Sequence, residues 1–260
     1  MVLTRKGISA SSEAIIKEQR QITREKLLAS PGLIIGTIGF LLILVTAILV
    51  PILNTQDPNA MVVMDRLKAP SAAHIFGTDE VGRDYLARVI YGGRISLLVG
   101  VLAMLMSITI GVTVGILAGY LGGIVDSILM RVVDVLQSIP WLILVTVVSI
   151  FFKQGLVSIV IVIGFFSWME IARLVRAEVM SVKEREYVLY ADFTGVSLLK
   201  MVIRHLIPSV LPTIIIAATT SISNAIMTES SLSFLGIGIQ EPLSSWGKLL
   251  QSAQSNLQNA

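Results

Sequence analysis

The chain alternates long apolar runs with short polar segments. Five runs approach or exceed the length of about 20 residues that a helix needs to cross the hydrocarbon core of a bilayer. They cover residues 32–52, 95–120, 128–152, 156–171 and 208–227. This pattern predicts an all-α polytopic membrane protein with five visible spans.

Composition fits a membrane protein and argues against several kinds of chemistry. Hydrophobic residues make up 54% of the chain and charged residues 14%, and the mean hydropathy is +0.83. Cysteine is absent and His74 and His205 are the only histidines, so we expect no disulfide and no bound metal. The P-loop, zinc-protease, nucleophile-elbow and dinucleotide-binding motifs are missing as well. We therefore expect no catalytic residue, no bound cofactor and no enzyme activity in this chain.

The distribution of charge predicts how the chain crosses the membrane. Residues 1–30 form a basic tail, which places the N-terminus in the cytoplasm and makes 31–52 the first span. Segment 53–93 is then extracytoplasmic, and the basic loop 173–206 is cytoplasmic. Residues 229–260 are too polar to cross the bilayer, so either the topology is odd or a sixth span follows the given C-terminus. Because this topology accounts for the net charge of +3, no nucleic-acid partner is expected.

One pattern lies just before the second apolar run, and another lies within that run. Residues Asp79–Tyr91 put apolar side chains on one helical face, which fits an amphipathic helix at the membrane interface or a solvated loop helix. Small residues then recur every four positions and predict a seam for close helix packing in lipid. They are Ala103, Ser107, Gly111, Gly115 and Gly119.

Polar residues inside the third and fifth runs suggest a route for solute. Arg131 and Asp134 lie three residues apart and are expected to pair. Pro140 is expected to kink the third span, either as a fixed bend or as a hinge for gating. A polar stripe in the fifth span fits either a water-filled path or hydrogen bonds between helices. The candidate residues of a translocation path are Gln137, Pro140, Thr220 and Asn224.

Two short helices, Glu186–Phe193 and Val196–Leu206, are predicted between the fourth and fifth runs. Gly195 between them permits a sharp turn. Tyr187 and Tyr190 would project from this elbow, which suits a groove in a partner protein because aromatic side chains often carry binding energy. The alternative is a cytoplasmic loop packed on itself.

The elbow resembles the cytoplasmic loop of permease subunits in binding-protein-dependent ABC importers. That family has Glu-Ala-Ala, three residues, Gly, and further on an apolar residue followed by proline. The frame is kept by Ala191, Gly195, Ile207 and Pro208, whereas Leu189-Tyr190 replaces Glu-Ala. Four more segments resemble the second permease of the dipeptide, oligopeptide and nickel branch, in a likeness that extends over residues 30–255. They are His74–Gly100, Arg131–Leu144, Ala172–Val188 and Glu229–Leu250.

The resemblance implies the type I importer permease fold, with a permease core at 94–228, a re-entrant segment at 229–260 and a sixth span beyond the given C-terminus. It also implies a second homologous permease, two ABC ATPases that bind ATP and Mg²⁺, and an extracytoplasmic solute-binding protein, assembled at the cell membrane. ATPase closure would push the elbow and drive alternating access. The residues expected to couple to the ATPases are Glu186, Tyr187, Tyr190, Ala191, Asp192, Gly195, Val196 and Lys200.

The implied function is ATP-driven uptake of di- or oligopeptides. Nickel, a metal chelate or another small solute is the alternative cargo, since the separate binding protein selects it. A secondary transporter is a more distant alternative, because such proteins commonly show internal repeats and intramembrane ionisable groups. A structural membrane scaffold would not require an exposed elbow.

Overall fold

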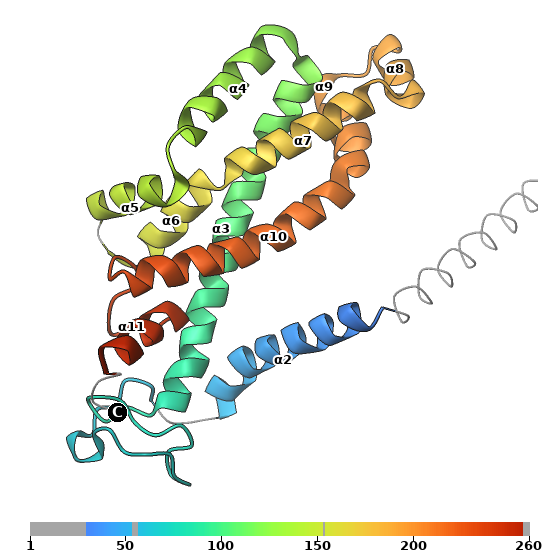
Figure 1. Cartoon of the computed structure of the whole chain (residues 1–260). Helices are drawn as coiled ribbons and strands as arrows, with labels where there is room; N and C mark the ends of the chain where they lie inside the picture. Colours follow the sequence, from blue (N-terminus) through green and yellow to red (C-terminus); the bar gives the residue numbers. More distant parts are fainter. Residues whose placement is uncertain (1–29, 54–56, 153, 257–260) are drawn as a thin grey trace, which may run out of the picture. The chain divides into compact units, whose positions relative to one another are not determined.

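The computed structural model describes residues 30–53, 57–152 and 154–256 (Figure 1). Within these ranges the regular structure is helical, apart from one bridge between Thr78 and Asp84. The chain divides into two compact units, one ending at Thr55 and the other beginning at Gln56. Of the first unit the described part is essentially one helix, α2 (Pro31–Leu53). The predicted N-terminal tail lies outside the described residues except for Ser30. The prediction of an all-α chain is confirmed.

The second unit begins with a loop that contains a short 3-10 turn and continues as a series of helices. Its elements are η1 (Val63–Asp65), α3 (Tyr85–Leu121), α4 (Gly123–Gln137), α5 (Trp141–Phe151), α6 (Leu156–Phe166), α7 (Trp168–Lys183), α8 (Glu186–Phe193), α9 (Leu198–Met201), the π-helical turn η2 (Val202–Leu206), α10 (Ile207–Phe234) and α11 (Trp246–Asn256).

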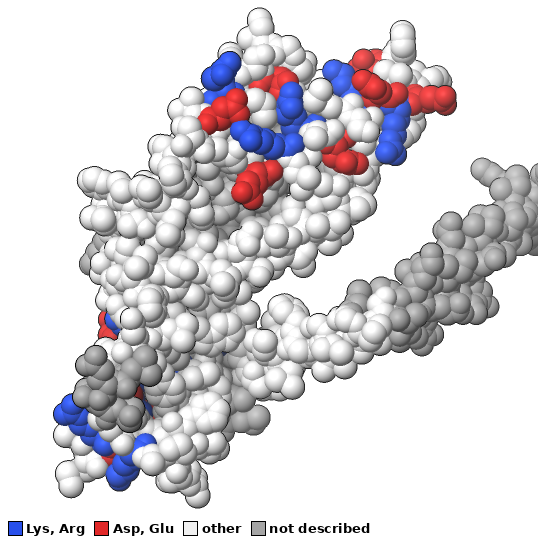
Figure 2. Space-filling model, in the orientation of Figure 1, with Lys and Arg blue, Asp and Glu red and all other residues white. Residues whose placement is uncertain are grey.

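Each predicted span has a helical counterpart in the described residues. Three stretches are long and apolar enough to cross a membrane, namely Tyr85–Leu121, Leu156–Lys183 and Leu198–Phe234. The pair α4 and α5 makes a fourth if its bend of 84° is taken as a break within one span. α2 contributes a shorter apolar stretch, Ile34–Ala47. Figure 2 shows charged side chains at the two ends of the second unit and an uncharged belt between them, as lipid contact requires.

The helices that correspond to the fourth and fifth predicted spans are longer than those spans. The fourth continues past Ile171 to Lys183, and the fifth begins at Leu198 and ends at Phe234. These added turns contain charged residues, which are typical of loops. In the structure the helices continue through these residues, beyond their apolar segments. η2 precedes Pro208, and a π-helical turn can accommodate a proline that lacks the N–H for an ordinary helical bond. The segment predicted to start at residue 229 therefore starts inside α10.

The third span is bent more sharply than a proline kink alone would suggest. α4 ends at Gln137 and α5 begins at Trp141, with Pro140 at the N-cap of α5. The predicted pairing of Arg131 with Asp134 is wrong, because Asp134 accepts a hydrogen bond from Arg173 of α7 at 2.5 Å. Both side chains of that pair are about half exposed, so it contributes little to stability.

The predicted separate helix over Asp79–Tyr91 is also wrong. Asp84 caps the N-terminus of α3 by accepting a hydrogen bond from the Ala87 N–H at 2.7 Å, and the helix then runs unbroken to Leu121. Gly92 and Gly93 lie inside α3 and do not interrupt it. Packing against neighbouring residues leaves little space for a side chain at either position. A Cβ on Gly93 would lie 2.9 Å from the Trp246 ring.

The small-residue seam of α3 is confirmed. A Cβ would lie 2.7 Å from Ile171 at Gly111, 2.7 Å from the Ala172 carbonyl oxygen at Gly115, and 2.8 Å from the Arg176 carbonyl oxygen at Gly119. All three neighbours belong to α7. The seam therefore brings the backbones of α3 and α7 together, as small residues do in membranes.

We expect Gly115→Ala to lower the thermal stability of the protein in detergent, at a cost of about 1–3 kcal/mol, because a backbone carbonyl cannot move aside for a methyl group. Unfolding followed by circular dichroism would measure the change. Gly36→Ala in α2 is the matched control, since a Cβ there meets nothing within 4 Å inside its own unit. An unchanged melting temperature for Gly115→Ala would contradict the close approach of the two helices.

Four charged residues form a cluster beside the N-terminus of α3, named here the Asp79 cluster. Asp79 Oδ2 accepts hydrogen bonds from Arg83 Nε and Arg88 Nη1, both at 2.6 Å, and the three side chains are almost fully buried. The half-exposed Glu241 accepts from Arg83 Nη2 at 3.0 Å. Burial opposes ionisation, but backbone N–H groups and the two guanidinium groups hold the pKa of Asp79 below its ordinary value. The cluster ties the loop before α3 to the loop after α10.

A second set of buried groups holds the start of α11 to α3 and α10. Glu229 is fully buried and accepts hydrogen bonds from the hydroxyl groups of Ser96 at 3.0 Å and Ser233 at 2.6 Å. Ser96 accepts in turn from the Trp246 N–H at 3.2 Å, and Ser233 accepts from the Ile239 N–H at 3.1 Å. The segment after α10 is therefore fixed to α3 by hydrogen bonds as well as by the Asp79 cluster.

Candidate functional site

The elbow formed by α8 and α9 is anchored by apolar side chains on its inner face. Val188 and Ala191 of α8 are 1% and 5% exposed and belong to a core that includes Val182 of α7, Met201 of α9 and Leu206 of η2. These residues come from consecutive elements, so α7, the elbow and the start of α10 share one core. The elbow is thus packed against the helices, and its outer face is presented in a fixed orientation.

The turn between α8 and α9 depends on Gly195. Its φ of +73° is unfavourable for residues with a side chain. The Gly195 N–H donates to the Asp192 carbonyl oxygen at 3.0 Å, and the Val196 N–H donates to the Ala191 carbonyl oxygen at 3.2 Å. This pair of bonds is a Schellman motif, which ends α8 and satisfies its last carbonyl groups. A Cβ at Gly195 would meet nothing within 4 Å, so the requirement for glycine comes from the backbone conformation.

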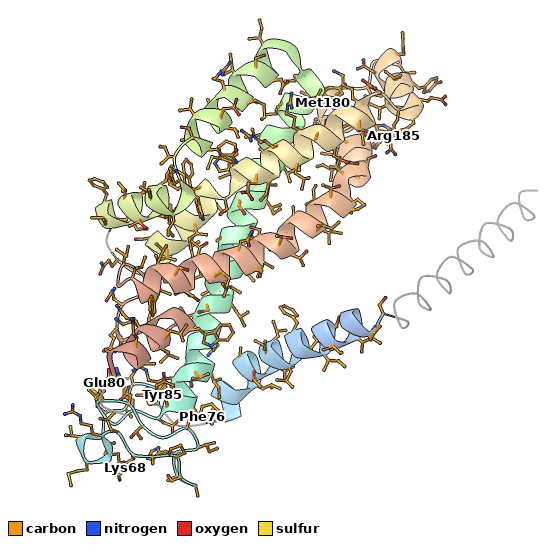
Figure 3. The ribbon with its side chains drawn as sticks, in the orientation of Figure 1. Lys68, Phe76, Glu80, Tyr85, Met180 and Arg185 are labelled. Atoms are coloured by element: carbon orange, nitrogen blue, oxygen red, sulfur yellow. The ribbon has the colours of Figure 1, made fainter. Side chains whose placement is uncertain are left out.

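Three large apolar or aromatic side chains of the elbow are strongly exposed. Phe193 is 91% exposed, Tyr190 72% and Leu199 69%. Beside them a surface hollow of about 710 Å³ is lined by Glu186, Tyr187, Tyr190, Ala191, Thr194, Val196 and His205. Figure 3 labels Arg185, where the chain enters α8. Five of the predicted coupling residues thus share one hollow, whereas Asp192, Gly195 and Lys200 do not line it.

Polar contacts connect the elbow to α3 and α10, and a further contact connects α7 to the end of α3. The Tyr120 hydroxyl, at the end of α3, donates to Asp192 Oδ1 at 3.0 Å. Lys183 Nζ, the last residue of α7, donates to the Tyr120 carbonyl oxygen at 2.7 Å. The hydroxyl groups of Tyr187 and Ser209 of α10 are 2.8 Å apart. A displacement of α8 would therefore act on α3 and α10 directly, and on α7 through its contact with the end of α3.

The four predicted path residues line a single cavity of about 890 Å³. Gln137 and Pro140 come from the break between α4 and α5, and Thr220 and Asn224 come from α10. The Thr220 hydroxyl donates to the Ile216 carbonyl oxygen of its own helix at 3.0 Å. The cavity also has apolar walls, which include Trp141. Its lining combines apolar surface with a few polar groups, as small-molecule sites usually do.

Sequence reasoning missed several residues of both sites. Glu170 and Arg173 also line the cavity. Both residues lie near the end of a predicted span, and neither was predicted to be part of the path. Phe193 and Leu199 belong to the exposed face of the elbow. The available signal was their apolar character in a segment that stands outside the lipid.

The chain is similar in sequence to permease proteins of known transport systems. A family model described as "Binding-protein-dependent transport system inner membrane component" matches residues 111–257. The chain is 41% identical over 266 residues to the oligopeptide transport system permease protein OppC of Escherichia coli (strain K12), covering 99% of this chain and 88% of that protein. It is 40% identical over 228 residues to the dipeptide transport system permease protein DppC of Bacillus subtilis (strain 168), covering 88% of this chain and 70% of that protein.

A solved structure supports the fold independently of close sequence likeness. A chain from inward-facing conformations of the MetNI methionine ABC transporter has a TM-score of 0.53 and 19% identity to this chain. The alignment covers 67% of this chain and 82% of that chain. The predicted type I importer permease fold is therefore confirmed. Since the family model covers more than half of the sequence and the similarity to a relative runs over nearly all of it, this chain belongs to the family of binding-protein-dependent transport system inner membrane components.

Proposed function

We propose that this chain is the permease subunit of an ABC importer that takes up di- or oligopeptides, using ATP hydrolysed by separate subunits. The observation that carries the proposal is the elbow. Its inner face is part of the helical core, its outer face exposes Tyr190 and Phe193, and its side-chain hydrogen bonds reach α3 and α10. Such a part can receive a push from a partner and pass it to the spans.

The elbow faces two ABC ATPases in the cytoplasm under this proposal. Arg185, Lys200 and Arg204 lie on or beside it, and positively charged segments favour the cytoplasmic side. Phe193 and Tyr190 insert into a groove of one ATPase, because exposed aromatic side chains bury large area at low entropic cost. ATP and Mg²⁺ bind to the ATPases. The N-terminus is cytoplasmic, and the opposite end of α3 faces an extracytoplasmic solute-binding protein.

The cavity between the α4–α5 break and α10 contributes one wall of the translocation path, and a second homologous permease supplies the other. The side-chain amides of Gln137 and Asn224 each offer a donor and an acceptor. Both can therefore exchange hydrogen bonds with peptide groups without selecting side chains. The break at Pro140 gives the path a place to open or close, since α4 and α5 are already separate helices.

The names of the relatives favour peptides over the alternative cargoes. Both the oligopeptide and the dipeptide transport systems contain proteins about 40% identical to this chain. Nickel, a metal chelate or another small solute requires a different binding protein, so cargo is decided by an experiment on the complex. Membership of a binding-protein-dependent family favours an importer over a secondary transporter. The same experiment on the complex distinguishes these two classes.

The test is purification of this chain in mild detergent from its native cells, followed by mass spectrometry of its partners and reconstitution into proteoliposomes. Recovery of two ATPases, a second permease and a solute-binding protein, with uptake of labelled di- or oligopeptide only when ATP reaches the ATPases, would support the proposal. Labelled nickel in place of peptide tests the alternative cargo. Transport by the chain alone, driven by an ion gradient, would overturn the importer.

A further inference from the structure

We propose that the Glu170 carboxylate is a subsite for a primary ammonium group of the transported peptide, inside the cavity between the α4–α5 break and α10. The assignment rests on the proposed function, because it gives a specificity-determining residue to the translocation path. Gln137 and Asn224 offer amide groups, which suit the main chain of any peptide. Glu170 adds a contact that distinguishes the charged N-terminus of a peptide from its other groups.

The cavity contains one uncompensated charge. Glu170 and Arg173 are the only charged residues among the described residues that line it. Arg173 Nη2 donates to Asp134 Oδ1 of α4 at 2.5 Å, which balances the charge of the guanidinium group. Glu170 is exposed and forms no hydrogen bond or ion pair with any other residue that the structure describes. The cavity therefore presents a free carboxylate, whereas its one arginine already has a partner.

Glu170 lies within the depth of the bilayer. The span that contains it begins at Leu156, and no residue between Leu156 and Glu170 is charged. At about 1.5 Å per residue this distance is about 21 Å, which is shorter than the hydrocarbon thickness of about 30 Å. Facing it across the cavity, the part of α10 between His205 and Glu229 is also uncharged. An ionisable group at such a depth is costly, and those that occur usually face a cavity and take part in transport.

The carboxylate is carried by a rigid part of the helix. Trp168 and Ala172, on either side of Glu170 in α7, are 7% and 0% exposed. A Cβ on Gly111 of α3 would lie 2.9 Å from the Trp168 carbonyl oxygen, and a Cβ on Gly115 would lie 2.7 Å from the Ala172 carbonyl oxygen. The first turn of α7 is therefore packed closely against α3. A helix also favours a negative charge in its first turn, where Glu170 lies.

A primary ammonium group is the complement of this carboxylate. A peptide at neutral pH carries an ammonium group at its N-terminus and a carboxylate at its C-terminus. The apolar walls of the cavity reduce screening, so the attraction between carboxylate and ammonium is stronger than in bulk water. Since Asp134 already balances Arg173, the described lining offers the peptide's C-terminal carboxylate no comparable partner. The subsite therefore recognises one end of the peptide. A lysine side chain carries the same group and is the second source of it.

The contact has to be weak enough to release the peptide. Transport requires binding that is favourable enough for entry but not so tight that the solute cannot leave. A single carboxylate that is exposed in an open cavity meets this requirement, because exposed ion pairs contribute only modestly. We therefore expect its removal to change uptake by about three- to tenfold, and not to abolish uptake.

Glu170→Gln tests the subsite in the complete importer in proteoliposomes. The solute-binding protein is supplied with labelled peptide already bound, and each peptide is compared between the altered and unaltered complexes, so selection by the binding protein cancels. Uptake of a lysine-free peptide is expected to fall about three- to tenfold, and uptake of its C-terminally amidated form is expected to fall equally. Uptake of the N-acetylated form should stay unchanged. Glu178→Gln is the matched control, because it removes the same charge from α7 at a position that does not line the cavity.

Two results would overturn the subsite. One is an equal loss for the free and N-acetylated peptides, which would mean that Glu170 supports the permease and does not contact the ammonium group. The other is no loss for either peptide. An N-acetylated peptide that contains lysine identifies the second source, because its uptake becomes sensitive to Glu170→Gln if the side-chain ammonium group binds there. Absence of ATP-driven uptake of every peptide by the unaltered complex would refute the proposed function instead.

A chemical rescue gives an independent readout. The chain contains no cysteine, so Glu170→Cys introduces a unique thiol into it. Alkylation with iodoacetate adds a carboxylate at this position, whereas iodoacetamide adds a neutral amide of similar size. Iodoacetate is expected to restore about three- to tenfold of the uptake of the free peptide relative to iodoacetamide. The unaltered complex treated with the same reagents is the control. Equal uptake after both reagents would contradict the role of the charge.

Discussion

Replacing Gly195 by valine is expected to reduce ATP-driven uptake to near background while the permease still inserts into the membrane. A β-branched residue at a φ of +73° costs about 1–3 kcal/mol. Because a Cβ at this position meets no atom within 4 Å, the variant has no steric clash that would unfold the surrounding core. The strain is relieved most easily by opening the turn between α8 and α9. That change separates Asp192 from Tyr120 and breaks the connection between the elbow and α3.

Uptake of labelled peptide and ATP hydrolysis should be measured together on the purified complex. Gly195→Asn is the matched control, since asparagine tolerates a positive φ and should preserve most of the uptake. Equal amounts of both variants in the membrane, with the ATPases still bound but uptake lost only for valine, would support coupling through the turn. Normal uptake by Gly195→Val would remove the elbow from the coupling mechanism.

The spans could be predicted from sequence because apolar run length and helix crossing are directly related. The ends of the helices could not be predicted in this way, since a helix can continue into polar sequence once it leaves the lipid. Lys183 shows this at the end of α7, where its ammonium group finds the Tyr120 carbonyl oxygen, a partner on another helix. The sequence around Lys183 does not indicate where that partner lies.

Charge pairing was the least predictable feature. Spacing favoured Arg131 with Asp134, but packing of α7 against α4 brings Arg173 to Asp134. The Asp79 cluster joins Asp79 to Glu241 through two arginines, and no helical period connects residues so far apart in the chain. Pro140 likewise signals a bend, whereas the angle of 84° depends on what α5 packs against.

The four predicted path residues line one cavity, and the reason is geometric. Thr220 and Asn224 are four residues apart, so helical periodicity alone places them on one face of α10. Gln137 and Pro140 share the break in the third span, and breaks in membrane helices tend to line cavities because free backbone groups need partners. The two pairs meet in one cavity. Glu170 and Arg173 were overlooked there because their exposure to the cavity depends on the rotation of α7.

Asp79→Asn is expected to be the most destabilising single substitution of a polar residue outside the spans. The amide retains an oxygen that can accept from the N–H groups of Val81 and Arg83, but it presents no charge to the guanidinium groups of Arg83 and Arg88. Two buried cations then share only the half-exposed Glu241. Removing one partner of a buried charge cluster costs about 3–5 kcal/mol. Glu241→Gln is the control and should cost about 1 kcal/mol or less, because its side chain is 45% exposed.

The pH dependence of unfolding separates the loss of charge from a change of shape. The native pKa of Asp79 lies below its ordinary value, so its stabilising contribution is complete above about pH 4 and is lost as the pH falls through the native pKa. The difference in melting temperature between the unaltered protein and Asp79→Asn should therefore be constant from pH 5 to 8 and should shrink at lower pH. A difference that persists unchanged in acid would mean that the side chain acts through shape.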